Sequence, residues 1–305
     1  MAKVLSINIS EARGTRKHPV TGEVKVTALG IEGDAHAGEW PRQVTLLDRQ
    51  SVEKMVRKEG RDFPPGSLAE NIDTEGIEMH TLPVGTHLLV GNVVLEISQI
   101  GKDPEESSPF HNEVGISIML SEGVFTRVVK PGTIKAGDEI SVVPDIRTAV
   151  ITISDKGYAG TREDQSGPAL IEVLMGKARV ERTAIVADEF EEIKALLKEL
   201  CDSGEFDVIF TTGGTGFAPR DVTPEATMAV IDRHAPGISE AIRQASMQIT
   251  PRAMLSRATA GIRRSTLIIN LPGSPKGAVE SIEVFLPVMA HAVETLRGDT
   301  YECGR

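Results

Sequence analysis

The sequence is poor in cysteine, in aromatic residues and in long apolar runs. Two cysteines among 305 residues can build neither a disulfide framework nor a cysteine-rich metal cluster. No apolar run approaches the roughly 20 residues of a membrane span, and Met1–Leu5 resembles the start of a strand rather than a secretory signal. A net charge of −11 disfavours nonspecific nucleic-acid binding, which needs a basic surface. We therefore expect a soluble, cytoplasmic protein that binds neither nucleic acid nor membrane, although a small anionic ligand stays possible.

What the sequence does contain is the patterning of two domains. Residues 1–143 hold short segments rich in Val, Ile and Leu between glycine-containing turns, which favours a mostly β, barrel-like or sandwich domain. One helix is predicted at 48–59, where Val52, Met55 and Val56 share a face. The predicted strands of this half are Val4–Ile9, Gln43–Leu47, His87–Val90, Val93–Ile97, Ile116–Met119 and Glu139–Val143.

Residues 147–305 alternate strand and helix patterns instead. This order predicts an α/β domain with a doubly wound, mostly parallel sheet and helices on both faces. Ligands of such sheets bind outside the carboxyl ends of the strands. The predicted strands are Thr148–Ile153, Val180–Val186, Asp207–Phe210 and Ser265–Asn270. The predicted helices are Pro168–Met175, Glu189–Cys201, Pro224–Arg233, Ile238–Met247 and Lys276–Leu296.

Polar loops follow four of these predicted strands. The most informative is Thr211–Gly216, where glycines let the main chain approach an anion and Thr212 and Thr215 add hydroxyl donors. Asp221 stands at the far end of that loop and could hold a divalent cation. The other loops contain Ser154-Asp155, Asp188 and Asn270–Gly277. All four should meet at one edge of the sheet, which predicts a site for a phosphate-bearing ligand and its metal.

Simpler interpretations of these loops remain open. Asp188 could be only the N-cap of the next helix, and Asp155 only a turn residue. Pro272 and Pro275 could make their loop rigid without giving it chemistry. No Walker lysine pattern or GxGxxG fingerprint follows a strand, which disfavours the P-loop and Rossmann interpretations.

These motifs together resemble the MogA/MoaB family of molybdenum cofactor biosynthesis, over about residues 147–297. The resemblance is carried by Thr211–Gly216 with Pro219–Ala226, Ser154-Asp155, Leu255–Arg257 with Ala260-Gly261, and Leu271–Lys276. Members of that family bind molybdopterin, and the MogA branch adenylylates it with ATP and Mg²⁺. The resemblance implies that Asp188 and Asp221 are catalytic and hold Mg²⁺, and it implies a homotrimer or hexamer. The substrate-binding residues that it implies are Ser154, Asp155, Thr212, Gly213, Gly214, Thr215, Gly216, Arg220, Ser256, Arg257, Pro272, Gly273, Ser274 and Lys276.

Three segments of the first half are informative together: Gly30–Gly38, Arg42–Val44 and Gly66–Asn71. They resemble a MOSC domain, a β-rich fold linked to the pterin–molybdenum cofactor and to sulfur transfer. Many MOSC domains carry a late cysteine that holds sulfur, but this chain has no cysteine before Cys201. The segment where that cysteine is expected contains Pro104, Ser107, Ser108 and Ser117. A serine oxygen cannot carry a persulfide, so binding of the pterin is the expected role.

The expected ligand residues of the first half are Asp34, His36, Arg42, Glu70 and Asn71. Asp34 and His36 alternate as strand residues do, so we expect them to point to one face, with too few further ligands for a zinc site. Arg42 could clamp a phosphate or form a surface ion pair. Trp40 fits a packing role better than a stacking one.

Our main hypothesis is a Mg²⁺-dependent adenylyltransferase acting on ATP and molybdopterin. The alternative is a carrier that binds molybdopterin without nucleotide chemistry. A third hypothesis is a hydrolase of nucleotides or pyridine cofactors, because the same fold resembles the competence-damage family.

Overall fold

The computed structural model describes residues 1–102 and 118–298. The chain divides into two compact units, Met1–Val143 and Pro144–Arg305. The serine-bearing segment 103–117 and Cys303 lie outside the described residues. Within the described ranges, no helix is both long enough and apolar enough to cross a membrane.

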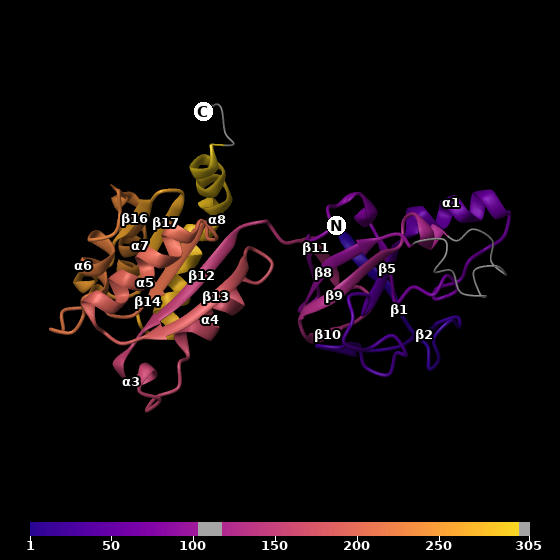
Figure 1. Ribbon diagram of the computed structural model, residues 1–305, viewed down its shortest axis with the longest axis horizontal. Helices are drawn as coiled ribbons and strands as arrows, with labels where there is room; N and C mark the ends of the chain where they lie inside the picture. Colours follow the sequence, from indigo (N-terminus) through magenta and orange to yellow (C-terminus); the bar gives the residue numbers. More distant parts are fainter. Residues whose placement is uncertain (103–117, 299–305) are drawn as a thin grey trace. The chain divides into compact units, whose positions relative to one another are not determined.

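Seven strands of the N-terminal unit close into a barrel (Figure 1). Their order around it is β11-β7-β8-β9-β5-β6-β1, and β1 returns to pair with β11, with Ala2 opposite Ile140. The β5–β6 pair is parallel and the other neighbours are antiparallel. Closure removes the unpaired edges that an open sheet would expose. The barrel strands are β1 Ala2–Ile9, β5 Val44–Asp48, β6 Ile72–Glu75, β7 His87–Val90, β8 Val93–Ile100, β9 Val124–Lys130 and β11 Glu139–Val142.

Smaller elements decorate the barrel. Strand β2 (His18–Val20) pairs with β1 outside the ring, and a separate small sheet has the order β10-β3-β4. Its strands are β3 Val24–Thr27, β4 Gly30–Ile31 and β10 Gly132–Ile134, and two 3₁₀ turns are η1 Met79–Thr81 and η3 Ile118–Leu120. The strand predicted at 116–119 is therefore wrong in its described part, because a 3₁₀ turn forms there.

The predicted helix of the N-terminal unit is confirmed as α1 (Arg49–Glu59). Asp48 begins it, since its side chain accepts the N–H of Ser51, and Gly60 ends it with a left-handed φ of 65°. Its buried residues Val52 and Met55 pack in a small apolar cluster beside the barrel. The helix therefore covers one side of the barrel with an amphipathic face.

The C-terminal unit is built on a six-stranded sheet of order β13-β12-β14-β17-β16-β15 (Figure 1). The first four strands run parallel, whereas the β17–β16 and β16–β15 pairs are antiparallel, so that β16 alone runs in the opposite direction. The sheet is thus mostly parallel, as expected. The strands are β12 Arg147–Ile153, β13 Arg179–Val186, β14 Val208–Thr212, β15 Arg233–His234, β16 Ala260–Arg263 and β17 Thr266–Leu271.

Helices pack on both faces of this sheet. Alternate strand residues divide between two apolar cores: Val150 and Phe210 join the core under α4, α7 and α8, and Ile151 and Ile209 join that under α5 and α6. The helices are α3 Asp155–Tyr158, α4 Ser166–Leu174, α5 Phe190–Ser203, α6 Thr223–Met228, α7 Pro236–Met247 and α8 Pro275–Arg297, with a 3₁₀ turn η4 at Pro251–Leu255. The helix predicted at 224–233 is too long, because Arg233 pairs with Ile262 in the sheet.

Candidate active site

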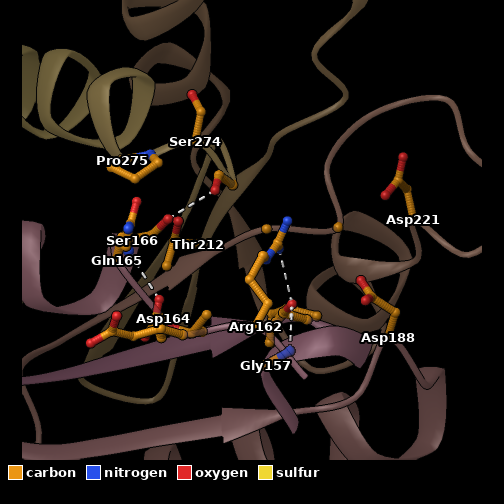
Figure 2. A pocket seen from close by; sticks show the side chains of 17 residues that line it. Gly157, Arg162, Asp164, Gln165, Ser166, Asp188, Thr212, Asp221, Ser274 and Pro275 are labelled. Atoms are coloured by element: carbon orange, nitrogen blue, oxygen red, sulfur yellow. Dashed lines mark hydrogen bonds between the residues drawn. The ribbon is translucent and has the colours of Figure 1, made fainter. Parts of the chain in front are cut away.

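A cavity of about 600 Å³ opens at the carboxyl ends of the parallel strands, as the loop positions predicted (Figure 2). The β12–α3 loop, the residues leading into α4, the β13–α5 and β14–α6 loops and the start of α8 all contribute to its wall. Its lining residues are Thr152, Ile153, Ser154, Gly157, Arg162, Glu163, Asp164, Gln165, Ser166, Asp188, Thr212, Gly213, Gly214, Asp221, Gly273, Ser274 and Pro275.

Asp188 is held in this wall by a reciprocal pair of hydrogen bonds. Its Oδ2 accepts the N–H of Asp155 at 2.8 Å, and its own N–H donates to Asp155 Oδ1 at 3.0 Å. Asp188 is not the N-cap of α5, because that position belongs to Glu189, whose side chain makes no capping bond. Its carboxylate is therefore available to the cavity.

Glycines of the β14–α6 loop lie directly against both acidic side chains. A Cβ on Gly214, whose φ is 61°, would stand 3.1 Å from Asp188 Oδ1 and 2.3 Å from Thr223 Oγ1. A Cβ on Gly216 would stand 2.9 Å from Asp221 Oδ2. Only glycine lets the main chain pass this close. The loop therefore joins the two carboxylates in one wall.

The acidic end of the cavity suits a cation. Burial raises the pKa of Asp188, and repulsion from Asp155 and Asp221 adds to that shift. Asp221 Oδ2 accepts the N–H of Ala218 at 2.8 Å. Within the described residues, Oδ1 of Asp188 and Oδ1 of Asp221 accept no hydrogen bond. Two carboxylates that repel each other and keep a free oxygen fit a shared divalent cation.

Donors of hydrogen bonds stand elsewhere in the wall. Ser274 caps α8, a helix of 23 residues whose N-terminus carries a partial positive charge toward the cavity. The predicted donor role of Thr212 is not available, because its hydroxyl donates to the carbonyl of Pro272 at 2.7 Å, and the hydroxyl of Ser166 is likewise used by the carbonyl of Gly273 at 2.8 Å. The predicted phosphate cradle is only partly available, because the N–H of Gly213 donates to Leu271 at 3.2 Å.

Arg162 is a cavity residue that sequence reasoning missed. It stands at the middle of the view in Figure 2, where its guanidinium donates to Ser154 Oγ at 3.3 Å. Among the described residues it forms no ion pair, although four acidic residues line the same cavity. Asp164, also missed, accepts the hydroxyl of Thr152 at 2.7 Å and the N–H of Ser166 at 2.9 Å. The only available signal was a run of three charged residues, Arg162–Asp164, in the loop after α3.

Several predicted substrate-binding residues stand outside the cavity wall. Arg257 supports the β14–α6 loop from behind, donating to the carbonyls of Gly216 (2.6 Å) and Asp221. Lys276 points to Glu280 at 3.7 Å and is 83% exposed. The predicted residues that do not line the cavity are Asp155, Thr215, Gly216, Arg220, Ser256, Arg257, Pro272 and Lys276.

The predicted ligand residues of the N-terminal unit mostly form hydrogen bonds within that unit. Asn71 joins neighbouring strands, accepting the N–H of Thr45 at 3.1 Å and donating to the carbonyl of Asn8 at 3.0 Å. Glu70 accepts the N–H groups of Gly66 and Leu68 at 2.5 and 3.0 Å within its own loop. Burial, with repulsion from a neighbouring carboxylate, raises the pKa of Glu70.

Asp34 and His36 lie in turns rather than in a strand, but they do face one group. That group is the buried ammonium of Lys17, whose Nζ stands 2.6 Å from Asp34 Oδ2 and 3.0 Å from His36 Nδ1. Burial alone would raise the pKa of Asp34, but hydrogen bonds from His36 and Lys17 outweigh it, and the pKa lies well below its usual range. Asp34 therefore neutralises a buried charge.

Aromatic and cationic side chains gather at the partly exposed side of this group. His36 stacks on Trp40 with ring centroids 6.1 Å apart. The guanidinium groups of Arg13 and Arg42 lie over the Trp40 ring, at 4.8 and 5.9 Å from its centroid. Cations placed over an indole face are attracted to it.

Comparison with known proteins matches each unit to a family. Residues 149–291 match the profile of a probable molybdopterin binding domain, and residues 33–102 match the MOSC domain. The chain is 42% identical over 157 residues to the molybdopterin adenylyltransferase of Helicobacter pylori strain J99, covering 50% of this chain and 89% of that protein. It is 43% identical over 141 residues to the enzyme of the same name from Escherichia coli K12, covering 45% and 72%. A crystal structure of the molybdopterin biosynthesis enzyme MoaB from Thermus thermophilus shares 47% identity, with a TM-score of 0.49, over 52% of this chain and 99% of that one.

Proposed function

The chain belongs to the MogA/MoaB-like family of molybdopterin-binding proteins, and we propose that its C-terminal unit transfers the adenylyl group of ATP to molybdopterin in the biosynthesis of the molybdenum cofactor. The observation that carries this proposal is that Asp188, Asp221 and the glycine loop lie together in the wall of one cavity. An acidic end for a metal and a donor-rich end for phosphates are what a nucleotidyl transfer requires.

In the proposed reaction, an oxygen of the terminal phosphate of molybdopterin forms a bond to the α-phosphorus of ATP. The bond from that phosphorus to the bridging oxygen of the β-phosphate breaks, and pyrophosphate leaves with the electron pair. No covalent intermediate with the protein is needed, so the work of the site is positioning and charge neutralisation.

Mg²⁺ fits the acidic end of the cavity. Within the described residues no cluster of three or more His, Cys, Asp or Glu offers a metal cage, and Mg²⁺ is commonly held by one or two carboxylates together with substrate phosphates. Oδ1 of Asp188 and Oδ1 of Asp221 would hold it. When bound there, Mg²⁺ would offset the charge that develops on the leaving pyrophosphate.

The donor-rich end would hold the phosphates. Arg162 has no carboxylate partner among the described residues, so an anionic ligand would supply one. The hydroxyl of Ser154 and the N-terminus of α8 at Ser274 would add hydrogen bonds to the same anion.

The N-terminal unit supports a secondary proposal, that it binds the pterin product. Its support is the match to the MOSC domain and the cationic group around Trp40. Because Trp40 is the only tryptophan, its fluorescence should be quenched when adenylylated molybdopterin is added. An unchanged emission at saturating ligand would argue against this role.

The main test is incubation with molybdopterin, ATP and Mg²⁺, followed by measurement of pyrophosphate and of the adenylylated product. We expect pyrophosphate only when molybdopterin is present. Binding of molybdopterin without pyrophosphate would identify a carrier instead, and hydrolysis of nucleotides without molybdopterin would identify a hydrolase.

The assigned carboxylates are tested by Asp188→Asn and Asp221→Asn. Each should lower turnover by at least about 100-fold, on the scale of removing one preorganised charge contact. Asp62→Asn, at an exposed site in the N-terminal unit, is the matched control and should keep wild-type turnover. Near-normal turnover in both cavity variants would reject their roles.

A further inference from the structure

Arg220 ties three loops together at the back of the acidic end of the cavity. Its Nε donates to Asp155 Oδ2 at 2.7 Å and its Nη2 to Asp155 Oδ1 at 2.8 Å, a two-pronged contact with one carboxylate. The same Nη2 stands 2.9 Å from Glu189 Oε1. One guanidinium thus links the β14–α6 loop to the β12–α3 loop and to the β13–α5 loop.

Each member of this linkage is next in sequence to a residue of the cavity wall. Asp155 follows Ser154, Glu189 follows Asp188, and Arg220 precedes Asp221. Asp155 also holds Asp188 directly, because its backbone N–H donates to Asp188 Oδ2 at 2.8 Å. Movement of the guanidinium would therefore be passed to three residues that line the cavity.

Arg220 itself does not line the cavity, so its charge is not directed at a ligand there. The Arg220 hydrogen bonds lower the pKa of Asp155, which keeps that carboxylate charged and able to accept them. A flat guanidinium with several fixed donors can orient two carboxylates at once, which an ammonium cannot.

We propose that Arg220 is a positioning residue, which holds the loops that carry Asp188 and Asp221 in register and so fixes the acidic end of the cavity without touching substrate. The expected change in turnover rests on the proposed adenylyl transfer, whereas the expected change in the order of the loops does not. A shift of about 1 Å in a reacting group can cost about 100-fold in rate. An exposed ion pair contributes little to folding stability. Removing Arg220 should therefore affect turnover far more than stability.

The first measurement is hydrogen exchange by mass spectrometry on the full chain without ligand. Arg220→Gln should speed exchange about 10-fold in peptides covering 154–158 and 187–190. The Asp155 carboxylate, which accepts the N–H of Asp188, loses its partner, and the bond from the N–H of Asp155 to Asp188 loosens with it. Exchange in α8 should stay unchanged, which shows that the variant is folded. Unaltered exchange in both loop peptides would overturn the proposal.

The second measurement is steady-state kinetics with molybdopterin, ATP and Mg²⁺. Arg220→Gln should lower kcat by about 10- to 100-fold and leave KM for ATP within about 3-fold, as expected of misplaced groups rather than lost contacts. A rise in KM for ATP with unchanged kcat would mean that Arg220 contacts the nucleotide, and would overturn the proposal.

A double variant tests whether the contact acts as a unit. Asp155→Asn keeps the backbone N–H that Asp188 accepts and one side-chain oxygen for the N–H of Asp188, so its main loss should be the two-pronged contact with Arg220. Arg220→Gln combined with Asp155→Asn should therefore be no slower than the slower single variant. If the rate losses of the two single variants multiplied in the double variant, Arg220 and Asp155 would act independently, which would contradict the linkage.

The chain offers a matched control in Arg179. This arginine also bridges two carboxylates, Asp145 at 3.0 Å and Glu181 at 2.8 Å, but at the amino end of β13. Arg179→Gln should leave both loop exchange and kcat unchanged. If the wild-type chain formed no adenylylated product, the proposed function would fail, and the exchange measurement would still decide the role of Arg220.

Discussion

Asp34 in the N-terminal barrel and Asp188 in the C-terminal unit are both carboxylates partly or wholly withdrawn from water, but their surroundings differ. Asp34 meets the ammonium of Lys17 and the N–H groups of Ser10 and His36, so both its oxygens have partners. Asp188 meets one backbone N–H on Oδ2, and other carboxylates repel it. The N-terminal unit compensates its buried charge internally, whereas at the sheet edge one oxygen of Asp188 has no hydrogen-bond partner among the described residues.

The difference follows from topology. The Lys17–Asp34 pair lies in segments that flank β2 and β4, short strands outside the ring, where the two charges neutralise each other. A parallel sheet brings all its carboxyl ends to one edge, where loops of unequal length leave a cavity. Charge at that edge is therefore more informative about function than charge that is merely buried.

The largest effect should come from breaking the compensation in the barrel. Asp34→Asn leaves the buried Lys17 ammonium without its counter-charge, which should cost about 3–5 kcal/mol of unfolding free energy. The side chains of Lys17 and Asp34 are 0% and 1% exposed, so water cannot replace the lost partner. Denaturant titration followed by Trp40 fluorescence measures it, because Trp40 bonds through Nε1 to the carbonyl of His36.

The matched control replaces both charges. Lys17→Met with Asp34→Leu removes the buried ions together and should be less destabilised than Asp34→Asn alone. If the double variant were the less stable one, the pair would stabilise the fold through its hydrogen bonds rather than through charge compensation.

The next effect concerns the glycine loop. Gly214→Ala should lower turnover by about 100-fold, because its new Cβ would meet Thr223 and Asp188 and displace the carboxylate. Gly204→Ala is the control: its φ of 73° brings similar backbone strain, but nothing lies within 4 Å of the added Cβ. Equal turnover in the two variants would mean that the close approach of Gly214 to Thr223 and Asp188 does not explain the lower rate.

A smaller effect is expected at the donor-rich end. Arg162→Gln should raise KM for the anionic substrates about 10-fold with a modest change in kcat, since one charge-assisted hydrogen bond is lost. Initial rates over a range of each substrate measure this. An unchanged KM for both ATP and molybdopterin would leave Arg162 without a role in binding.

The smallest effect concerns the reactivity of a buried thiol that does not line the cavity. Cys201 lies in the core under α5, and burial raises its thiol pKa to about 12. In a Cys303→Ser background, Cys201 should therefore not react with iodoacetamide at pH 8 until denaturant is added. Mass spectrometry counts the label. Rapid labelling of the native chain would show that this core opens readily.

The fold of the C-terminal unit was the more predictable part. The i, i+3, i+4 pattern of Phe190, Ile193 and Leu197 indicated α5, and the strands that end at the cavity were found within a few residues. The helix predicted at 224–233 is confirmed only as far as α6 (Thr223–Met228), because the sequence pattern does not reveal that Arg233 pairs with a strand. That strand, β16, was too short to show its own periodicity.

The candidate site was predictable where glycine and carboxylate coincide at a strand end, as at Gly214 and Asp221. It was not predictable where a side chain reaches the cavity from a longer loop, as Arg162 does. In the barrel, alternation of Asp34 and His36 suggested a strand, whereas both lie in turns around Lys17. Sequence gives no sign that a lysine 17 positions before Asp34 and 19 before His36 is their partner.

The pairing of β1 with β11 has a consequence for synthesis. Lys3 lies opposite Glu139, so the first strand of the barrel to leave the ribosome waits for its last partner until nearly half the chain has been made. Until then β6 pairs with one side of β1 and β2 with part of the other, so only the Ala2–Lys3 end of that other side lacks its partner and stays open to other chains. Slow translation just before that point would prolong the interval in which nascent chains can associate.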